Sequence, residues 1–169
     1  MGTLIPWILV VIAAARLVHL DADPGLIKSI LTNAADVGDE AYWAFGAINL
    51  ILFHTLVSDN YLQAATSPFY TVITYVAYWL FGVSMYTTRL PNAVLGIAAV
   101  VIAYRLMEPY SRPAAFVAGL TLALENHLFI HSRMGQVEAT CGFFALLAFY
   151  LLIRSKAPGL AGAALGLSV

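Results

Sequence analysis

Long apolar runs, separated by short turns that carry the charges, constrain the fold of this chain more than any other feature. The sequence has 169 residues, of which 62% are hydrophobic and 10% are charged, and its mean hydropathy is +0.85. This composition cannot supply the polar shell of a water-soluble domain, and several runs approach the roughly 20 apolar residues that cross a bilayer. The sequence therefore predicts an integral protein of a cell membrane, surrounded by membrane lipid.

Six apolar runs follow one another along the chain, at residues 2–20, 69–83, 90–107, 114–130, 139–153 and 159–169. A serine or threonine stands shortly before each of four prolines, namely Pro68, Pro91, Pro113 and Pro158. This pattern is typical of helix starts, because the hydroxyl caps the helix and proline suits its first turn. The pair Asp23-Pro24 predicts a shorter helix in the same way. The expected fold class is all-α, a polytopic bundle of transmembrane helices.

The first run allows two interpretations. Three alanines at 13–15 offer the small-residue cleavage site of a signal peptide. However, no lysine or arginine precedes the apolar stretch, as the signal-peptide pattern requires. We therefore favour an uncleaved first span.

Charge excludes one class of partner, and the single cysteine adds no constraint. The formal net charge is −1, and eight lysines and arginines are scattered over the chain. Binding of phosphate backbones needs a basic stripe, so no nucleic acid is expected as a partner. Cys141 is the only cysteine and cannot form an intramolecular disulfide.

The basic turns decide the predicted topology, since short cytoplasmic loops are enriched in lysine and arginine. If every run spans, with the N-terminus inside, the basic turns at 105–112 and 154–156 fall outside. If the run 69–83 instead lies in the membrane plane, both turns become cytoplasmic. The acidic residues of the loop at 21–88 then gather outside, and the turn at 131–138 is external too. The tyrosines, threonines and tryptophan of PFYTVITYVAYWLFG suit the membrane interface. An ordinary second span is the alternative.

On the favoured interpretation the chain is a single membrane domain, 1–169. It has an external first loop at about 21–88, with in-plane juxtamembrane helices, and spans at about 2–20, 89–107, 113–130, 138–153 and 158–169. The multi-pass protein lies in the cytoplasmic membrane with its site on the extracytoplasmic side.

Few ionisable groups occur in this apolar background, so each is expected to serve placement or chemistry. Asp39 and Glu40 stand together before an apolar stretch, although carboxylates also favour the first turn of an ordinary helix. For Arg16, the alternative to a role in the site is that its side chain only extends to the membrane interface. Glu125 lies within an apolar run, where burial of a charge is costly, and is expected to be paired or functional.

Four segments, in order and spacing, resemble the N-terminal half of the GT-C glycosyltransferases. They are GDEAYW at 38–43, Asp59, the stretch from SPFYTV to TRLPNAVLG at 67–96, and HSRMGQVEA at 131–139. Within that superfamily the chain is most similar to the protein O-mannosyltransferases and to the bacterial transferases that add aminoarabinose to lipid A. The similarity extends from about residue 16 to about residue 150.

The resemblance implies a function and a set of site residues. Members of the family pass a sugar from a polyprenyl-phosphate donor to an acceptor outside the cytoplasm. Asp39 matches the loop carboxylate of the catalytic centre, with Glu40 beside it, and Asp59 matches a second acidic position. Arg89 falls where the mannosyltransferases place an arginine at the head of the next span.

A second part of the pattern lies in the later loop. Arg133 and Glu138 fit an arginine that is followed five positions on by an acid. Two departures leave the acceptor open. Thr66-Ser67-Pro68 replaces a His-Pro-Pro segment of the mannosyltransferases, and Tyr42 replaces an arginine of the aminoarabinose transferases.

The chemistry of sugar transfer requires a base and a positive charge. A sugar phosphate already has a good leaving group, so the acceptor must lose a proton and the departing phosphate must be neutralised. Asp39 is the expected base. The positive charge comes either from a divalent ion such as Mg²⁺ or Mn²⁺ held by Asp39 and Glu138, or from Arg16, Arg89 and Arg133. The in-plane aromatic helix offers a groove for the polyprenyl tail.

Two functions of different class remain. One is a glycosyltransferase module, and the other is a non-catalytic membrane subunit or scaffold that works with a partner subunit. Family members are considerably longer, and this chain stops inside the apolar run LAGAALGLSV. A fragment without its C-terminal part, or a minimal N-terminal module, is therefore expected.

Overall fold

The computed structural model of the chain describes residues 4–21, 35–56 and 66–168, and in these ranges it contains helices and turns but no β-strand. The all-α prediction is thereby confirmed. The elements are α1 (Leu4–Ala13), a 3-10 turn (Ala14–Leu17), α2 (Ala35–Phe53), α4 (Pro68–Phe81), α5 (Met85–Met107), α6 (Arg112–Leu124), α7 (Asn126–Ser132), α8 (Val137–Tyr150), a π-helical turn (Leu151–Ser155) and α9 (Pro158–Gly166).

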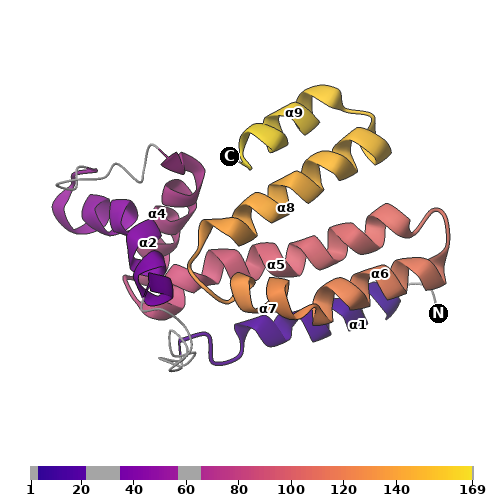
Figure 1. Cartoon of the computed structure of the whole chain (residues 1–169), viewed down its shortest axis with the longest axis horizontal. Helices are drawn as coiled ribbons and strands as arrows, with labels where there is room; N and C mark the ends of the chain where they lie inside the picture. Colours follow the sequence, from indigo (N-terminus) through magenta and orange to yellow (C-terminus); the bar gives the residue numbers. More distant parts are fainter. Residues whose placement is uncertain (1–3, 22–34, 57–65, 169) are drawn as a thin grey trace.

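The helices form a bundle with two further helices gathered at one of its ends (Figure 1). Helix α5 packs against α1, α6 and α8, and α9 packs on α8. Helices α2 and α4 contact each other and lie at the end where α5 begins. The turns from α5 to α6 and from α8 to α9 lie at the opposite end.

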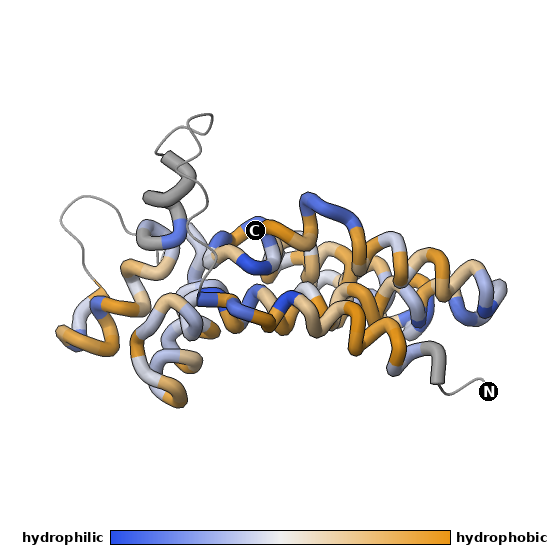
Figure 2. The backbone as a smooth tube through the Cα atoms, turned by 90° about the horizontal axis from the view of Figure 1, so that it is seen from below, coloured by the Kyte–Doolittle hydropathy of each residue, from blue (hydrophilic) through white to orange (hydrophobic). Residues whose placement is uncertain are grey.

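Two helical segments are long and apolar enough to cross a membrane, Met85–Met107 and Val137–Ser155. The pair Arg112–Leu124 and Asn126–Ser132 adds a third if this pair, bent by 58°, is one broken span. The first run forms a shorter apolar helix, Pro6–Leu17. Figure 2 shows apolar residues along most of the bundle and hydrophilic segments at both of its ends, as expected of helices in a bilayer, with one more hydrophilic segment partway along it.

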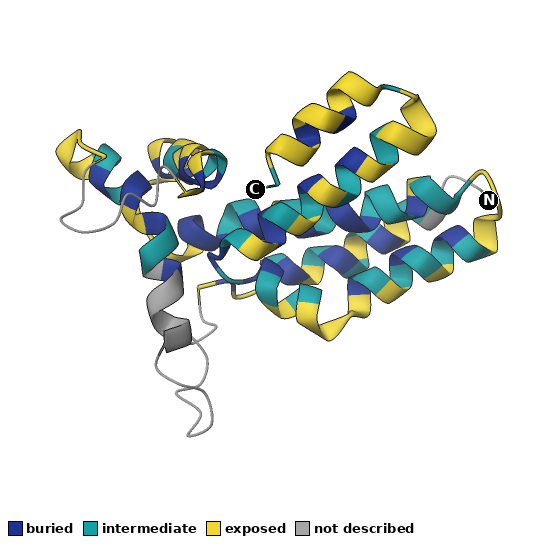
Figure 3. Ribbon diagram, turned by 45° about the horizontal axis from the view of Figure 1, so that its top comes forward, coloured by how far each residue is buried: buried dark blue, intermediate teal, exposed yellow. Residues whose placement is uncertain are grey.

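Alanines pack against larger side chains at the centre of the bundle. The core of α1, α5 and α6 consists of Leu9, Ala13, Val100, Tyr104, Ala115 and Ala123. At Gly119 an added Cβ would lie 2.6 Å from Leu9 Cδ1, so a larger residue here would require the Leu9 side chain to shift. A second cluster of Phe144, Ala148 and Ala164 joins α8 to α9. Buried residues therefore line the helix contacts, while α9 is largely exposed (Figure 3).

The predicted helix starts are right at three prolines and wrong at the fourth. Helices α4, α6 and α9 have proline in their first turn. Pro91 instead lies inside α5, which begins at Met85 because the Ser84 side chain accepts a hydrogen bond from Thr87 N at 3.1 Å. The N-cap of α5 is therefore Ser84, which lies seven residues before Pro91. The helix expected at Asp23-Pro24 lies outside the described residues.

Helix α4 corresponds to the disputed run at 69–83. It has 14 residues, is absent from the segments long enough to cross, and turns into α5 through Gly82, whose φ is +79°. Only glycine adopts this conformation readily. The sharp turn sets α4 apart from the bundle axis that α5 follows (Figure 1).

Candidate functional site

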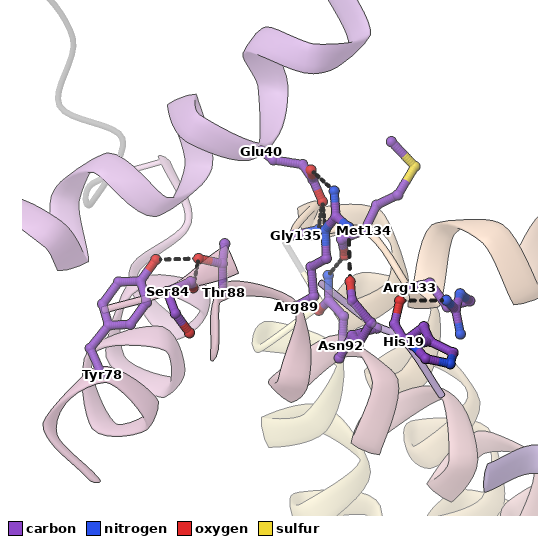
Figure 4. A network of polar contacts seen from close by, with 11 residues as sticks. His19, Glu40, Tyr78, Ser84, Thr88, Arg89, Asn92, Arg133, Met134 and Gly135 are labelled. Carbon is purple, nitrogen blue, oxygen red and sulfur yellow. Dashed lines mark hydrogen bonds and ion pairs between the residues drawn. The ribbon is translucent and has the colours of Figure 1, made fainter. Parts of the chain in front are cut away.

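A buried ion pair between α5 and α2 lies at the centre of the site (Figure 4). Arg89 Nε donates to Glu40 Oε1 at 2.9 Å, and Arg89 Nη2 donates to Glu40 Oε2 at 2.7 Å. Both side chains are 1% exposed. The parallel bonds form a bidentate pair, the strongest arrangement of guanidinium and carboxylate. Arg89 Nη1 also donates to Leu20 O at 2.9 Å, which ties the end of the first segment to the same point.

The turn between α7 and α8 completes this junction. The backbone N–H of Gly135 donates to Glu40 Oε1, so both carboxylate oxygens of Glu40 are engaged. A Cβ at Gly135 would lie 2.8 Å from Thr88 Cγ2, and glycine is therefore required for the close approach. The side chain of Asn92 holds the same turn through the carbonyls of Met134 and Gln136. Three segments far apart in sequence thus meet at Glu40.

Helix α4 adds buried hydroxyl groups beside the carboxylate. The hydroxyl of Tyr70 lies close to Gly135, 3.3 Å from where a Cβ would stand. Tyr78 and Thr88 share a hydrogen bond of 2.7 Å between their hydroxyl oxygens. Burial raises the pKa of Tyr70 and of Tyr78, and the nearby negative charge of Glu40 acts in the same direction. Both phenols therefore stay protonated and neutral beside the ion pair.

Arg16 and Arg133 make a second set of contacts nearby. Arg16 binds the end of α6, and Arg133 binds the end of the first helical segment. Arg16 donates to Ser132 Oγ at 3.0 Å and to the carbonyls of Ala123 and Leu122, where α6 ends. Arg133 donates to the carbonyls of Ala15, Arg16 and His19, where the first helix ends.

Both guanidinium groups also lie over the ring of Phe129, at 5.0 Å for Arg16 and 5.6 Å for Arg133 from the ring centroid. Helix-end carbonyls attract positive charge. The two arginines therefore bind the first segment to the turn that carries Gly135.

The predicted site residues have different places in the structure. Glu40 and Arg89 are paired, and Arg16 and Arg133 are buried in helix-end contacts. Glu138 is exposed in the first turn of α8, close enough to affect the pKa of Tyr70. Asp39 belongs to α2, but its side chain, like the whole of Asp59, lies outside the described residues. The shared cavity of Asp39 and Glu138 stays a prediction.

Metal binding also stays a prediction. No group of three or more histidine, cysteine, aspartate or glutamate side chains able to hold an ion occurs within residues 4–21, 35–56 and 66–168. Glu138 presents one exposed carboxylate beside the junction. Mg²⁺ commonly needs only one or two carboxylates together with substrate phosphates.

Glu125 has hydrogen-bond partners, as expected, but it is not buried inside the protein. This residue is exposed at the break between α6 and α7, and its carboxylate accepts hydrogen bonds from His127 N at 2.9 Å and Leu128 N at 2.6 Å. It caps α7, whose free N–H groups need such an acceptor. The sequence does not indicate this cap, because no proline or glycine marks the break in the apolar run.

Three residues of the junction were not predicted as site residues: Tyr70, Asn92 and Gly135. Asn92 gave a usable signal, because an amide within an apolar span is costly unless it is bonded. Tyr70 resembles the other interfacial tyrosines of its run, and the packing against Gly135 is visible only in three dimensions.

Comparison with known proteins identifies the family. The model of the dolichyl-phosphate-mannose-protein mannosyltransferase family matches residues 65–168. The putative mannosyltransferase YkcB of Bacillus subtilis (strain 168) is 31% identical over 81 residues, and this match covers 47% of the chain but 11% of that relative. No solved structure matches the chain. The resemblance seen in the sequence is confirmed: the chain belongs to the dolichyl-phosphate-mannose-protein mannosyltransferase family of GT-C glycosyltransferases.

Proposed function

We propose that this chain is a glycosyltransferase module that transfers a sugar from a polyprenyl-phosphate donor to an acceptor on the extracytoplasmic side of the membrane. Membership of the family supports glycosyltransferase activity in general. The donor, the side of the membrane and the role of Asp39 are the proposal. The observation that carries it is the buried junction of Glu40, Arg89 and Gly135, because Asp39 directly precedes Glu40 on α2.

The junction gives the start of α2 a defined position. Glu40 is held by Arg89 and by the Gly135 amide, and a buried, fully bonded carboxylate of this kind cannot move without a large cost. The backbone of Asp39 is therefore anchored at the same end of the bundle as the first turn of α8, which carries Glu138. Catalytic groups need this kind of fixed support.

In the proposed reaction, Asp39 accepts the proton of the acceptor hydroxyl while the oxygen of that hydroxyl bonds to the anomeric carbon of the sugar. The bond from that carbon to the phosphate oxygen breaks, and the electron pair leaves with the polyprenyl phosphate. A divalent ion, held by Asp39 and Glu138, would neutralise the leaving phosphate; arginine is the alternative source of positive charge. Arg16, Arg89 and Arg133 make protein contacts in this structure, so a phosphate would have to share or replace them.

The two ends of the bundle support the proposed orientation. The basic turns that carry Arg105, Arg112, Arg154 and Lys156 lie at the end opposite to α2 and α4. The positive-inside rule assigns that end to the cytoplasm and the Glu40 end to the outside. At the Glu40 end, α4 exposes Trp79, Leu80 and Phe81 by 68%, 56% and 65%. Such residues suit the headgroup level of a bilayer, where a polyprenyl tail enters the lipid.

The test separates donor binding from sugar transfer in Asp39→Asn. This change keeps the shape of the side chain but removes the base, so turnover should fall by on the order of 10²–10⁴ while donor binding changes little. If Asp39 mainly holds a metal ion, donor binding should weaken too, and added Mg²⁺ or Mn²⁺ should partly restore it. Asp21→Asn is the matched control, since Asp21 is an exposed aspartate near the junction.

The result also separates the two classes of function. Wild-type transfer by Asp39→Asn in an active protein would contradict the proposal. Donor binding without transfer would instead favour the non-catalytic subunit.

A further inference from the structure

Asn92 is fully buried on α5, one helical turn after Arg89, and it contacts the turn between α7 and α8 on both sides of Gly135. Its Nδ2 donates to Met134 O at 2.7 Å and to Gln136 O. Its Oδ1 accepts a hydrogen bond from Thr140 Oγ1 at 2.8 Å. The orientation of the amide is unambiguous, because carbonyl oxygens accept and never donate.

These contacts enclose the peptide group whose N–H reaches Glu40. Met134 and Gln136 flank Gly135, so fixing their two carbonyls leaves the Gly135 amide little freedom of rotation. Arg89 and Asn92 lie on one side of α5 and act on the two halves of the same contact: Arg89 orients the carboxylate of Glu40, and Asn92 orients its N–H donor (Figure 4). Thr140 extends this support into α8.

We infer that Asn92 is a positioning residue of the junction. It holds the turn at 134–136 so that the Gly135 amide meets Glu40, and through Glu40 it sets the place of the α2 start. The consequence for sugar transfer rests on the proposed function, in which Asp39 on α2 is the base. Asparagine suits this role because its short, planar amide group offers two N–H donors and one acceptor oxygen on a single side chain. Aspartate lacks the donors, and leucine of similar size satisfies none of the three groups.

The position of the turn is tested without any activity measurement. Met134→Cys is introduced into a Cys141→Ser background, and the alkylation rate of the half-buried thiol is measured in membranes. Asn92→Leu should raise that rate on the order of tenfold, because the carbonyls of the turn lose their buried donors. Asn92→Asp should act similarly, and Thr140→Val less, since it removes one bond. Asn126→Asp, an exposed asparagine at the start of α7, is the matched control and should leave the rate unchanged.

The link to transfer is tested by kcat and KM of the same variants without the reporter cysteine. Asn92→Leu should lower kcat by on the order of 10²-fold with KM for the donor nearly unchanged, because a misplaced base affects the chemical step. An unchanged thiol rate in Asn92→Leu would overturn the inference. A raised rate with normal kcat would overturn its catalytic half. If the wild type shows no transfer, the proposed function fails, but the thiol rate still decides whether Asn92 holds the turn.

Discussion

The two ends of the bundle use charge in opposite ways. At one end Arg89 and Glu40 form a pair at 2.7 Å with both side chains 1% exposed. At the other end Arg105 and Glu108 form a pair at 2.9 Å with side chains 53% and 29% exposed. The second pair lies within one turn at the end of α5, where Glu108 also accepts a hydrogen bond from Tyr104 Oη at 3.4 Å. The first pair connects α2 to α5 and, through Gly135, to the turn before α8.

The difference shows that similar ion pairs have different tasks. An ion pair between exposed charges at a helix end adds little to stability. Basic residues at a helix end instead favour the placement of that end on the cytoplasmic side of the membrane. A buried pair has lost its hydration and persists only with complete hydrogen bonding, so it fixes the geometry of the groups around it. The buried end is therefore where chemistry is expected, and the exposed end is where topology is determined.

Labelling from the two sides of the membrane should separate the ends completely. In a Cys141→Ser background, a membrane-impermeant thiol reagent should reach His131→Cys from the outside and Arg112→Cys only from the cytoplasm, because basic turns stay inside. Lys156→Cys should behave as Arg112→Cys does. Labelling of residues 112 and 131 from the same side would show that the bundle does not place these turns on opposite faces of the membrane.

Breaking the buried pair should have the largest effect on stability. Arg89→Met leaves the Glu40 carboxylate buried without its partner and should lower the free energy of unfolding by about 3–5 kcal/mol. Denaturant titration in detergent micelles measures this change. The double variant Glu40→Leu with Arg89→Met should be less destabilised than Arg89→Met, since no lone charge remains. Equal loss in single and double variants would mean that packing, and not charge, decides.

The close approach at Gly135 should have an intermediate effect. Gly135→Ala places a methyl group against Thr88 Cγ2 and should cost about 1–3 kcal/mol of unfolding free energy, as overpacking does. Thr88→Ser removes that carbon while keeping the hydroxyl that bonds Tyr78, so the double variant should recover most of the loss. Failure of this rescue would contradict the close contact.

The exposed pair should matter least. Glu108→Gln should change the free energy of unfolding by at most about 0.5 kcal/mol, because solvent screens the pair and its side chains keep other conformations. The same titration measures it under the conditions used for Arg89→Met. A loss comparable to that of Arg89→Met would abolish the distinction between the two ends.

Much of the fold could be predicted from the chain because its signals are local. Apolar length identifies a membrane protein, and serine before proline marks the starts of α4 and α6. The start of α5 was misplaced because two hydroxyl residues, Ser84 and Thr88, are both candidates to cap this helix. Ser84 is the cap that forms, since its side chain accepts from Thr87 N, and the Thr88 hydroxyl instead donates to Ser84 O. The break before α7 was missed because a carboxylate cap, and no proline or glycine, marks it.

The sequence by itself determined the class of protein, the all-α fold and the family. Only the tertiary structure decided that Glu40 binds Arg89 and that Asn92 and Gly135 complete the junction. The reason is physical: hydropathy, caps and motifs act over a few neighbouring residues. The partners of Glu40 are 49 and 95 positions away, and their contact depends on how α2, α5 and the turn before α8 pack together.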